Sequence, residues 1–158
     1  MSFGPPAQKA QLRSTRCQLT DVMTSEQRSR CMSRIRGRNT KPELQVRSCL
    51  HRLGYRFRLH DAQLPGHPDI VLPRYRTVVL VHGCFWHRHE GCGYAYVPKS
   101  RQAFWETKFK NNTARDRAIE QKLESLGWGV VVIWECQTRN ASALTESLRT
   151  ALPPRVNR

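Results

Sequence analysis

The chain has 158 residues, enough for one domain with a single packed core, and its 27 Lys and Arg residues outnumber 12 Asp and Glu residues to give a net charge of +15. This excess indicates a polyanionic partner, with nucleic acid the leading class. The sequence shows neither an apolar run long enough to span a membrane nor the apolar core of a signal peptide, so we expect a cytoplasmic protein with no membrane partner.

The N-terminal part of the chain divides in two. Residues 1–22 carry a Pro-Pro pair and polar residues with little periodic apolar content, which predicts a flexible tail. Residues 23–158 then form a single domain that opens with a basic arm over residues 23–40. This arm suits a phosphate backbone, since it contains the arginines Arg28, Arg30, Arg34, Arg36 and Arg38.

The first predicted helix starts at Thr40, an N-cap residue, and has Pro42 in its first turn. Gly54 ends it. Its apolar stripe is predicted to consist of Leu44, Leu50 and Leu53.

Three strands follow in the predicted order. Residues 55–59 alternate aromatic and basic side chains, and residues 69–72 form a second strand after a turn at residues 64–66. Residues 75–81 end in a continuous β-branched run, as expected of a central strand buried on both faces.

The second half of the chain is predicted to hold a helix over residues 101–126, a buried strand over residues 128–134 and a helix over residues 141–150. The long helix has one apolar side, made of Trp105, Phe109, Ile119, Leu123 and Leu126. This order of elements gives an α/β fold of three layers, with a central mixed sheet between helices. A crossover through the long helix should place the two buried strands side by side, and so bring Cys136 beside Cys84.

Residues 82–92 contain more candidate metal ligands than one ion needs: His82, Cys84, His87, His89 and Cys92. A tetrahedral zinc takes four Cys or His ligands. We expect a structural Zn2+ site made of Cys84, His89, Cys92 and Cys136. Spacing alone also allows His87 in place of His89, and Cys136 can instead be a buried thiol at a strand end.

The residues left over, His82 and His87 with Asp69 and Glu43, are sufficient for metal-assisted hydrolysis of a phosphodiester. A carboxylate such as Asp69 can hold Mg2+. One neutral histidine can then activate water while the other stabilises the leaving oxygen. Each residue also has a purely structural alternative: a turn for Asp69, a capping box for Glu43 and orientation of zinc ligands for either histidine.

Several ordered motifs resemble the very short patch repair endonucleases of bacteria, the Vsr family. They include Val81-His-Gly-Cys-Phe-Trp-His87, Leu64-Pro-Gly-His-Pro-Asp69 and Arg28-Ser-Arg-Cys-Met-Ser-Arg34, together with Phe104-Trp105, Asn112, Arg115-Asp116 and the segment from Leu126 to Cys136. The resemblance runs from about Thr24 through Cys136 and leaves out residues 1–22.

This resemblance implies a restriction-endonuclease-like fold and an enzyme that nicks double-stranded DNA on the 5′ side of the thymine in a T:G mismatch, the product of 5-methylcytosine deamination. It implies Mg2+ on Asp69 and on the backbone carbonyl of Val81, His87 as general base and His82 at the leaving group. Glu43 would orient the water around the metal. The family also implies a monomer associated with the nucleoid, with mismatch-repair proteins such as MutL as further partners.

DNA recognition is expected from the aromatic residues Phe85, Trp86 and Trp105, which the family resemblance implies are inserted between base pairs. Unstacking costs least at a mismatch, so insertion favours damaged over intact DNA. Met32 and the arginine arm would approach from the other groove, as in the family. The alternatives are that Trp105 anchors its helix in the core and that the arm only contacts phosphates.

The chain departs from the family pattern at two places. Val81 stands where the family often has Thr, and the loop from His89 to Cys92 is one residue longer than in some relatives. Two other functions remain open on the residues alone: a zinc-stabilised DNA-binding module without catalysis, and a restriction endonuclease of the same fold.

Overall fold

The computed structural model describes residues 24, 26–27, 30, 33 and 37–155. The predicted tail over residues 1–22 lies outside them, as do Met32 and three arginines of the basic arm, Arg28, Arg34 and Arg36.

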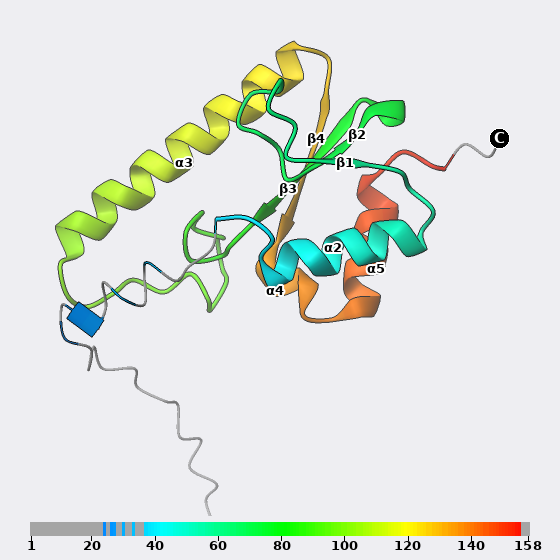
Figure 1. Ribbon diagram of the computed structural model, residues 1–158. Coiled ribbons are helices and arrows are strands. Elements are labelled where there is room, and N and C mark those ends of the chain that lie inside the picture. Colours follow the sequence, from blue (N-terminus) through cyan, green and yellow to red (C-terminus); the bar gives the residue numbers. More distant parts are fainter. Residues whose placement is uncertain (1–23, 25, 28–29, 31–32, 34–36, 156–158) are drawn as a thin grey trace, which may run out of the picture.

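Within the described residues, four strands form one mixed sheet in the order β1-β2-β3-β4 (Figure 1). The strands are β1 (Arg58–Leu59), β2 (Ile70–Leu72), β3 (Thr77–His82) and β4 (Gly129–Trp134). A 3-10 turn, η1 (Pro73–Tyr75), connects β2 to β3. β1 pairs with β2 and β2 with β3 in antiparallel fashion, whereas β3 and β4 are parallel and in register from Thr77 opposite Gly129 to His82 opposite Trp134. The predicted side-by-side placement of these two strands is confirmed.

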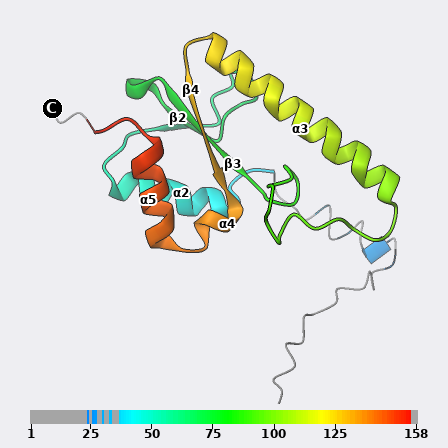
Figure 2. The same ribbon diagram turned by 180° about the vertical axis from the view of Figure 1, so that it is seen from behind.

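Helices cover both faces of the sheet (Figures 1 and 2). The long helix α3 (Gln102–Ser125) lies on one side, and α2 (Lys41–Arg52), α4 (Glu135–Thr138) and α5 (Ala141–Ala151) lie on the other. Side chains alternate across the sheet as strand geometry requires: Val79 packs in the core under α2 and α5, while its neighbour Val78 packs in the core that includes Leu123 of α3. The predicted α/β sandwich with a mixed sheet is confirmed.

Helices α2 and α5 begin after N-cap residues whose side chains accept hydrogen bonds from the first turn. Thr40 caps α2 in a capping box with Glu43, and Asn140 accepts hydrogen bonds from two backbone N–H groups in the first turn of α5. No helix in the described part of the chain combines the length and the apolar character needed to cross a bilayer.

Four details of the prediction are wrong. Leu44 is 53% exposed and Leu126 is 52% exposed, because Leu44 lies off the face of α2 that carries Val46 and Leu50, and Leu126 lies at the C-cap of α3. The strand at residues 129–134 is only partly buried, since β4 is an edge strand with a single neighbour. The first strand is also shorter than predicted, because β2 offers it only Ile70 and Val71 as partners.

Candidate active site and metal cluster

The candidate active site lies where β3 ends. Asp69 comes directly before β2, and because β2 runs antiparallel to β3, Asp69 Oδ2 accepts a hydrogen bond of 2.8 Å from the backbone N–H of Val81. A cavity of about 1250 Å³ opens at this place. Its lining includes most of the predicted catalytic and DNA-contacting residues: Glu43, Asp69, Val81, His82, Trp86, His87 and Trp105. Asp69 is thus fixed by the sheet and is not a simple turn residue.

The environment of Asp69 disfavours its charged form. Burial raises the pKa of the Asp69 carboxyl, and the nearby carboxylate of Glu43 adds to this effect, while the hydrogen bond from Val81 and the positive charges nearby oppose it. A divalent cation at this carboxylate would relieve the same penalty. Since Oδ2 accepts the Val81 N–H, the other carboxylate oxygen is available for a cation.

His82 and His87 form a stacked pair at the mouth of the loop that follows β3. Their ring centroids are 4.0 Å apart, with an angle of 6° between the planes. His87 Nδ1 lies 2.5 Å from Oδ2 of Asp116 on α3. Burial, the largest single cause, would raise the pKa of Asp116, but the hydrogen bond from His87 and the nearby positive charges of His87, His82 and Arg115 together outweigh it, so the pKa is lowered. An ionised Asp116 accepts the Nδ1 proton, which leaves Nε2 of His87 with a free lone pair.

His82 has a different electrostatic character from His87. Burial and the neighbouring His87 lower the pKa of His82 to about 4. The imidazole of His82 is therefore neutral at physiological pH. A neutral ring can donate one hydrogen bond and accept another, and a phosphate beside it would favour its protonation.

Glu43 is both a capping residue and a member of the site. Its Oε1 accepts hydrogen bonds from the backbone N–H and the hydroxyl of Thr40, at 3.3 and 2.8 Å. Its Oε2 accepts from the backbone N–H of Asn39 and from Arg47, at 3.0 and 2.7 Å. The capping-box alternative is therefore correct, and the same carboxylate still lines the cavity with Asp69.

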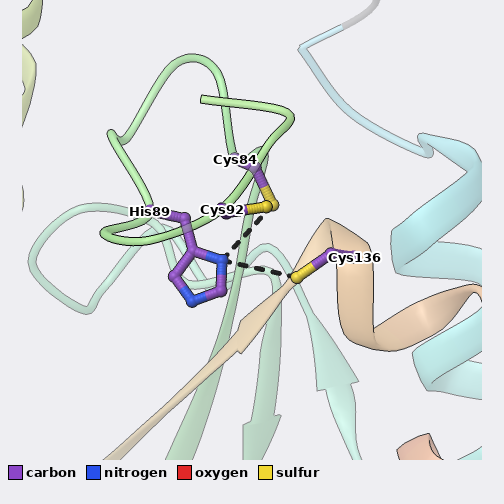
Figure 3. A group of neighbouring side chains, drawn as sticks. All are labelled: Cys84, His89, Cys92 and Cys136. Carbon is purple, nitrogen blue, oxygen red and sulfur yellow. Dashed lines mark hydrogen bonds between the residues drawn. The ribbon is translucent and has the colours of Figure 1, made fainter. Parts of the chain in front are cut away.

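A second cluster, drawn in Figure 3, is made of Cys84, His89, Cys92 and Cys136. The ligand atoms of Cys84, His89, Cys92 and Cys136 lie within 4.8 Å of one another. His89 Nδ1 is 3.7 Å from Cys84 Sγ and 3.3 Å from Cys136 Sγ. With the usual Zn–S and Zn–N bond lengths, the N–S edge of a tetrahedron is about 3.6 Å, so these separations fit a Cys3His zinc site.

The chemistry of the donors supports the same fit. Burial, the largest of several effects, raises the pKa of the Cys84 thiol to about 12, so a thiolate at this position needs a positive partner. His87 points into the cavity with Asp116 and is not part of this cluster. The structure therefore places His89 with the cysteines and His87 with His82.

The backbone of the loop explains this separation. His87 N donates to Gly83 O, and His89 N donates to Cys84 O, so consecutive turns send the two histidines in different directions. Trp134 at the end of β4 stacks on His89, with ring centroids 4.2 Å apart, and meets His82 edge-on at 5.5 Å. One indole thus lies between the two groups.

The predicted DNA-contacting aromatics gather in one group around Phe85, whose ring lies 5.0 Å from Trp86 and 5.3 Å from Trp105. Trp105 is only 8% exposed and also stacks on Phe109, so it anchors α3 as the structural alternative expected. Trp86 lines the cavity, and Asn112 Nδ2 donates a hydrogen bond of 3.0 Å to its backbone carbonyl.

Sequence reasoning assigned no role to Asp116, Arg47, His60 or Trp134. For Asp116 a signal was present: it lies at helical spacing from Phe109 and Asn112, so an acidic residue occupies the inward face of α3. For Arg47 and His60 no local signal exists, because they meet through the tertiary fold at 3.0 Å.

Comparison with known proteins places these observations in a family. The model of the DNA mismatch endonuclease Vsr family matches residues 20–93. The type II nicking enzyme V.XorIIP of Xanthomonas oryzae pv. oryzae is 48% identical over 86% of this chain and 99% of its own length. The type II nicking enzyme V.NmeAIP of Neisseria meningitidis serogroup A is 43% identical over 82% of this chain and 92% of its own length. The DNA mismatch endonuclease Vsr of Escherichia coli is 42% identical over 84% of each chain. The chain therefore belongs to the DNA mismatch endonuclease Vsr family.

Proposed function

We propose that this protein nicks double-stranded DNA 5′ of the thymine in T:G mismatches, by Mg2+-dependent hydrolysis with His87 as general base. The observation that carries the proposal is the convergence of the His87–Asp116 pair and the partly buried carboxylate of Asp69 on one cavity. Two nicking enzymes and a mismatch endonuclease among the relatives support it. The restriction-endonuclease-like fold and the single domain over residues 23–158 are part of the same proposal.

The metal would be held by Asp69, with the backbone carbonyl of Val81 as a second ligand. When bound, Mg2+ neutralises charge on the scissile phosphate and lowers the pKa of a coordinated water. Glu43 has both carboxylate oxygens engaged by protein donors, so its proposed role is indirect: it helps to orient the water around this position through the donor groups that it holds in place.

The two histidines have different proposed roles. His87 accepts a proton from the attacking water at Nε2, because Asp116 holds its Nδ1 proton and stabilises the imidazolium that forms. His82 donates a hydrogen bond to the phosphate or to the leaving oxygen. Its stacking against His87 fixes both rings in parallel planes, so one positions the other.

The Cys3His cluster would hold a structural zinc that ties the loop after β3 to the start of α4. Trp86 lines the cavity beside the proposed chemistry and packs against Phe85, and insertion of these aromatic rings next to a mismatch would cost the least unstacking. The phosphate backbone would lie along basic residues of the cavity rim, which include Arg101, Lys108 and Arg115.

The test is a nicking assay with end-labelled duplexes that carry T:G, paired T:A or paired C:G at the same position, with and without Mg2+. The proposal expects one cut 5′ of the mismatched thymine and none in the paired duplexes. A non-catalytic binding module would shift the T:G duplex and leave both strands whole. A restriction enzyme would cut both strands of paired DNA.

A further inference from the structure

A third group of metal-capable side chains includes Asp69, the proposed Mg2+ ligand. The ligand atoms of Glu43, His60 and Asp69 are within 4.8 Å of one another. They come from α2, from the residue after β1 and from the residue before β2. Two carboxylates and one imidazole form a set that binds Mn2+ and similar transition ions. By ligand chemistry alone, this group could take a divalent ion across all three residues.

Arg47 opposes the binding of such an ion, because it already contacts two of the three ligand residues. Its Nη2 lies 2.7 Å from Glu43 Oε2 and 3.0 Å from His60 Nε2, and its Nη1 donates to Asn39 Oδ1 at 2.7 Å. A guanidinium has donors only, so His60 Nε2 must accept from it. The lone pair that His60 would offer to a metal and one oxygen of Glu43 are therefore both engaged by a protein cation.

The burial of Arg47 strengthens this effect. Its side chain is 10% exposed, and its Nε has no hydrogen-bond partner among the described residues. Burying a cation with an unsatisfied donor costs free energy, so packing alone does not explain the residue. In return, a buried positive charge acts on nearby charges with little screening by solvent. The charges that face Arg47 are Glu43 on its own helix and Asp69 across the site.

We propose that Arg47 is a built-in cation that confines divalent metal binding to Asp69. It neutralises Glu43, holds the lone pair of His60 and so prevents a metal from bridging the Glu43–His60–Asp69 group. The inference rests on the proposed metal role of Asp69. Arg47 is a positioning residue: it fixes Glu43 beside the reaction and sets how tightly, and at how many residues, the chain binds a divalent ion.

The test measures Mn2+ binding by calorimetric titration of the zinc-loaded, full-length protein in the absence of DNA. Arg47→Met removes the charge at similar length and is expected to bind Mn2+ at least about tenfold more tightly than the wild type. Arg47→Lys keeps the charge and is expected to retain the wild-type affinity. The double variant Arg47→Met/His60→Gln should lose most of the gain, because the freed imidazole is then missing. A folded Arg47→Met protein with wild-type affinity, or an equal gain in Arg47→Lys, would overturn the proposal.

A second comparison does not depend on the folding of Arg47→Met. Glu43→Gln removes no metal ligand under the proposal but leaves the charge of Arg47 uncompensated, so it is expected to weaken Mn2+ binding only about tenfold, whereas Asp69→Asn removes the ligand and abolishes binding. Equal losses in both variants would refute the proposal. Since these titrations contain no DNA, a failure to nick T:G duplexes would refute the proposed function and leave the metal-binding result intact.

Discussion

Asp116 on α3 accepts a hydrogen bond from Nδ1 of His87, a residue 29 positions earlier on the loop after β3. The contact joins the long crossover helix to the proposed general base. It fixes the tautomer of His87 and directs Nε2 into the cavity.

Replacement of Asp116 by Asn should therefore damage the chemical step more than DNA binding. An amide cannot stabilise an imidazolium as a carboxylate does, and we expect the single-turnover nicking rate on T:G DNA to fall about 10²- to 10⁴-fold. The affinity for the duplex should change little, because Asp116 is 9% exposed. Glu120→Gln, one turn further along α3, is the matched control and should nick at the wild-type rate. A rate within threefold of wild type in Asp116→Asn would exclude a role for the His87–Asp116 pair in the chemical step.

The two histidines of the loop can be separated by metal analysis. His89→Ala is expected to lose the zinc measured by elemental analysis and to lower the Tm, because one of four ligands is removed. His87→Ala should keep about one zinc per chain while losing nicking activity. Retention of full zinc in His89→Ala, or its loss in His87→Ala, would reverse the assignment of the two residues.

The raised pKa of Asp69 predicts a gain in stability when its charge is removed. A carboxyl whose pKa is higher in the folded state than in the unfolded state stabilises the protein below the unfolded pKa, and this contribution is lost as the pH rises through the folded pKa. Asp69→Asn cannot ionise and can still accept the Val81 N–H. We expect its Tm at pH 7, without divalent metal, to exceed that of the wild type by about 2–4 °C.

The same comparison has an internal control in its pH dependence. The difference in Tm between Asp69→Asn and the wild type should shrink as the pH falls through the raised pKa, and close near pH ~4, where the unfolded carboxyl titrates. Asp61→Asn, in the same connection between β1 and β2, should show no such gain. A wild type more stable than Asp69→Asn at pH 7 would contradict the desolvation argument.

Trp86 provides a test of mismatch discrimination. Loss of one stacking aromatic costs about 1–3 kcal/mol of binding, so Trp86→Ala should weaken affinity for T:G DNA about 5- to 150-fold and affect paired DNA less. Leu59→Ala serves as the control, since Leu59 is an exposed apolar residue on β1, outside the lining of the cavity. Equal losses on T:G and paired duplexes in a competition assay would remove Trp86 from mismatch recognition.

The parts of this molecule that could be predicted from its sequence are those with local causes. The Thr40 capping box starts α2, and the β-branched run at residues 77–81 forms the central strand. The pairing of β3 with β4 followed from the crossover rule. Leu44 and Leu126 were misassigned because periodicity alone does not define which stripe of a helix meets the sheet.

The side-chain contacts within the candidate site could not be predicted from local sequence patterns. Spacing allowed either His87 or His89 beside the cysteines, and only the turns that start at Gly83 and Cys84 separate them. The partner of His87 came from a helix whose rotation was unknown, and the Arg47–His60 contact joins two segments with no shared motif. These contacts depend on how distant segments pack in the folded chain, and sequence motifs do not specify that packing.

Trp134 joins the two halves of the site, since its ring stacks on His89 and meets His82 edge-on. A shift of the His89 ring would therefore move the indole against which His82 of the proposed catalytic pair packs. The two groups share one aromatic support, so a change that displaces His89 from the Cys3His cluster is expected to disturb the position of His82 as well.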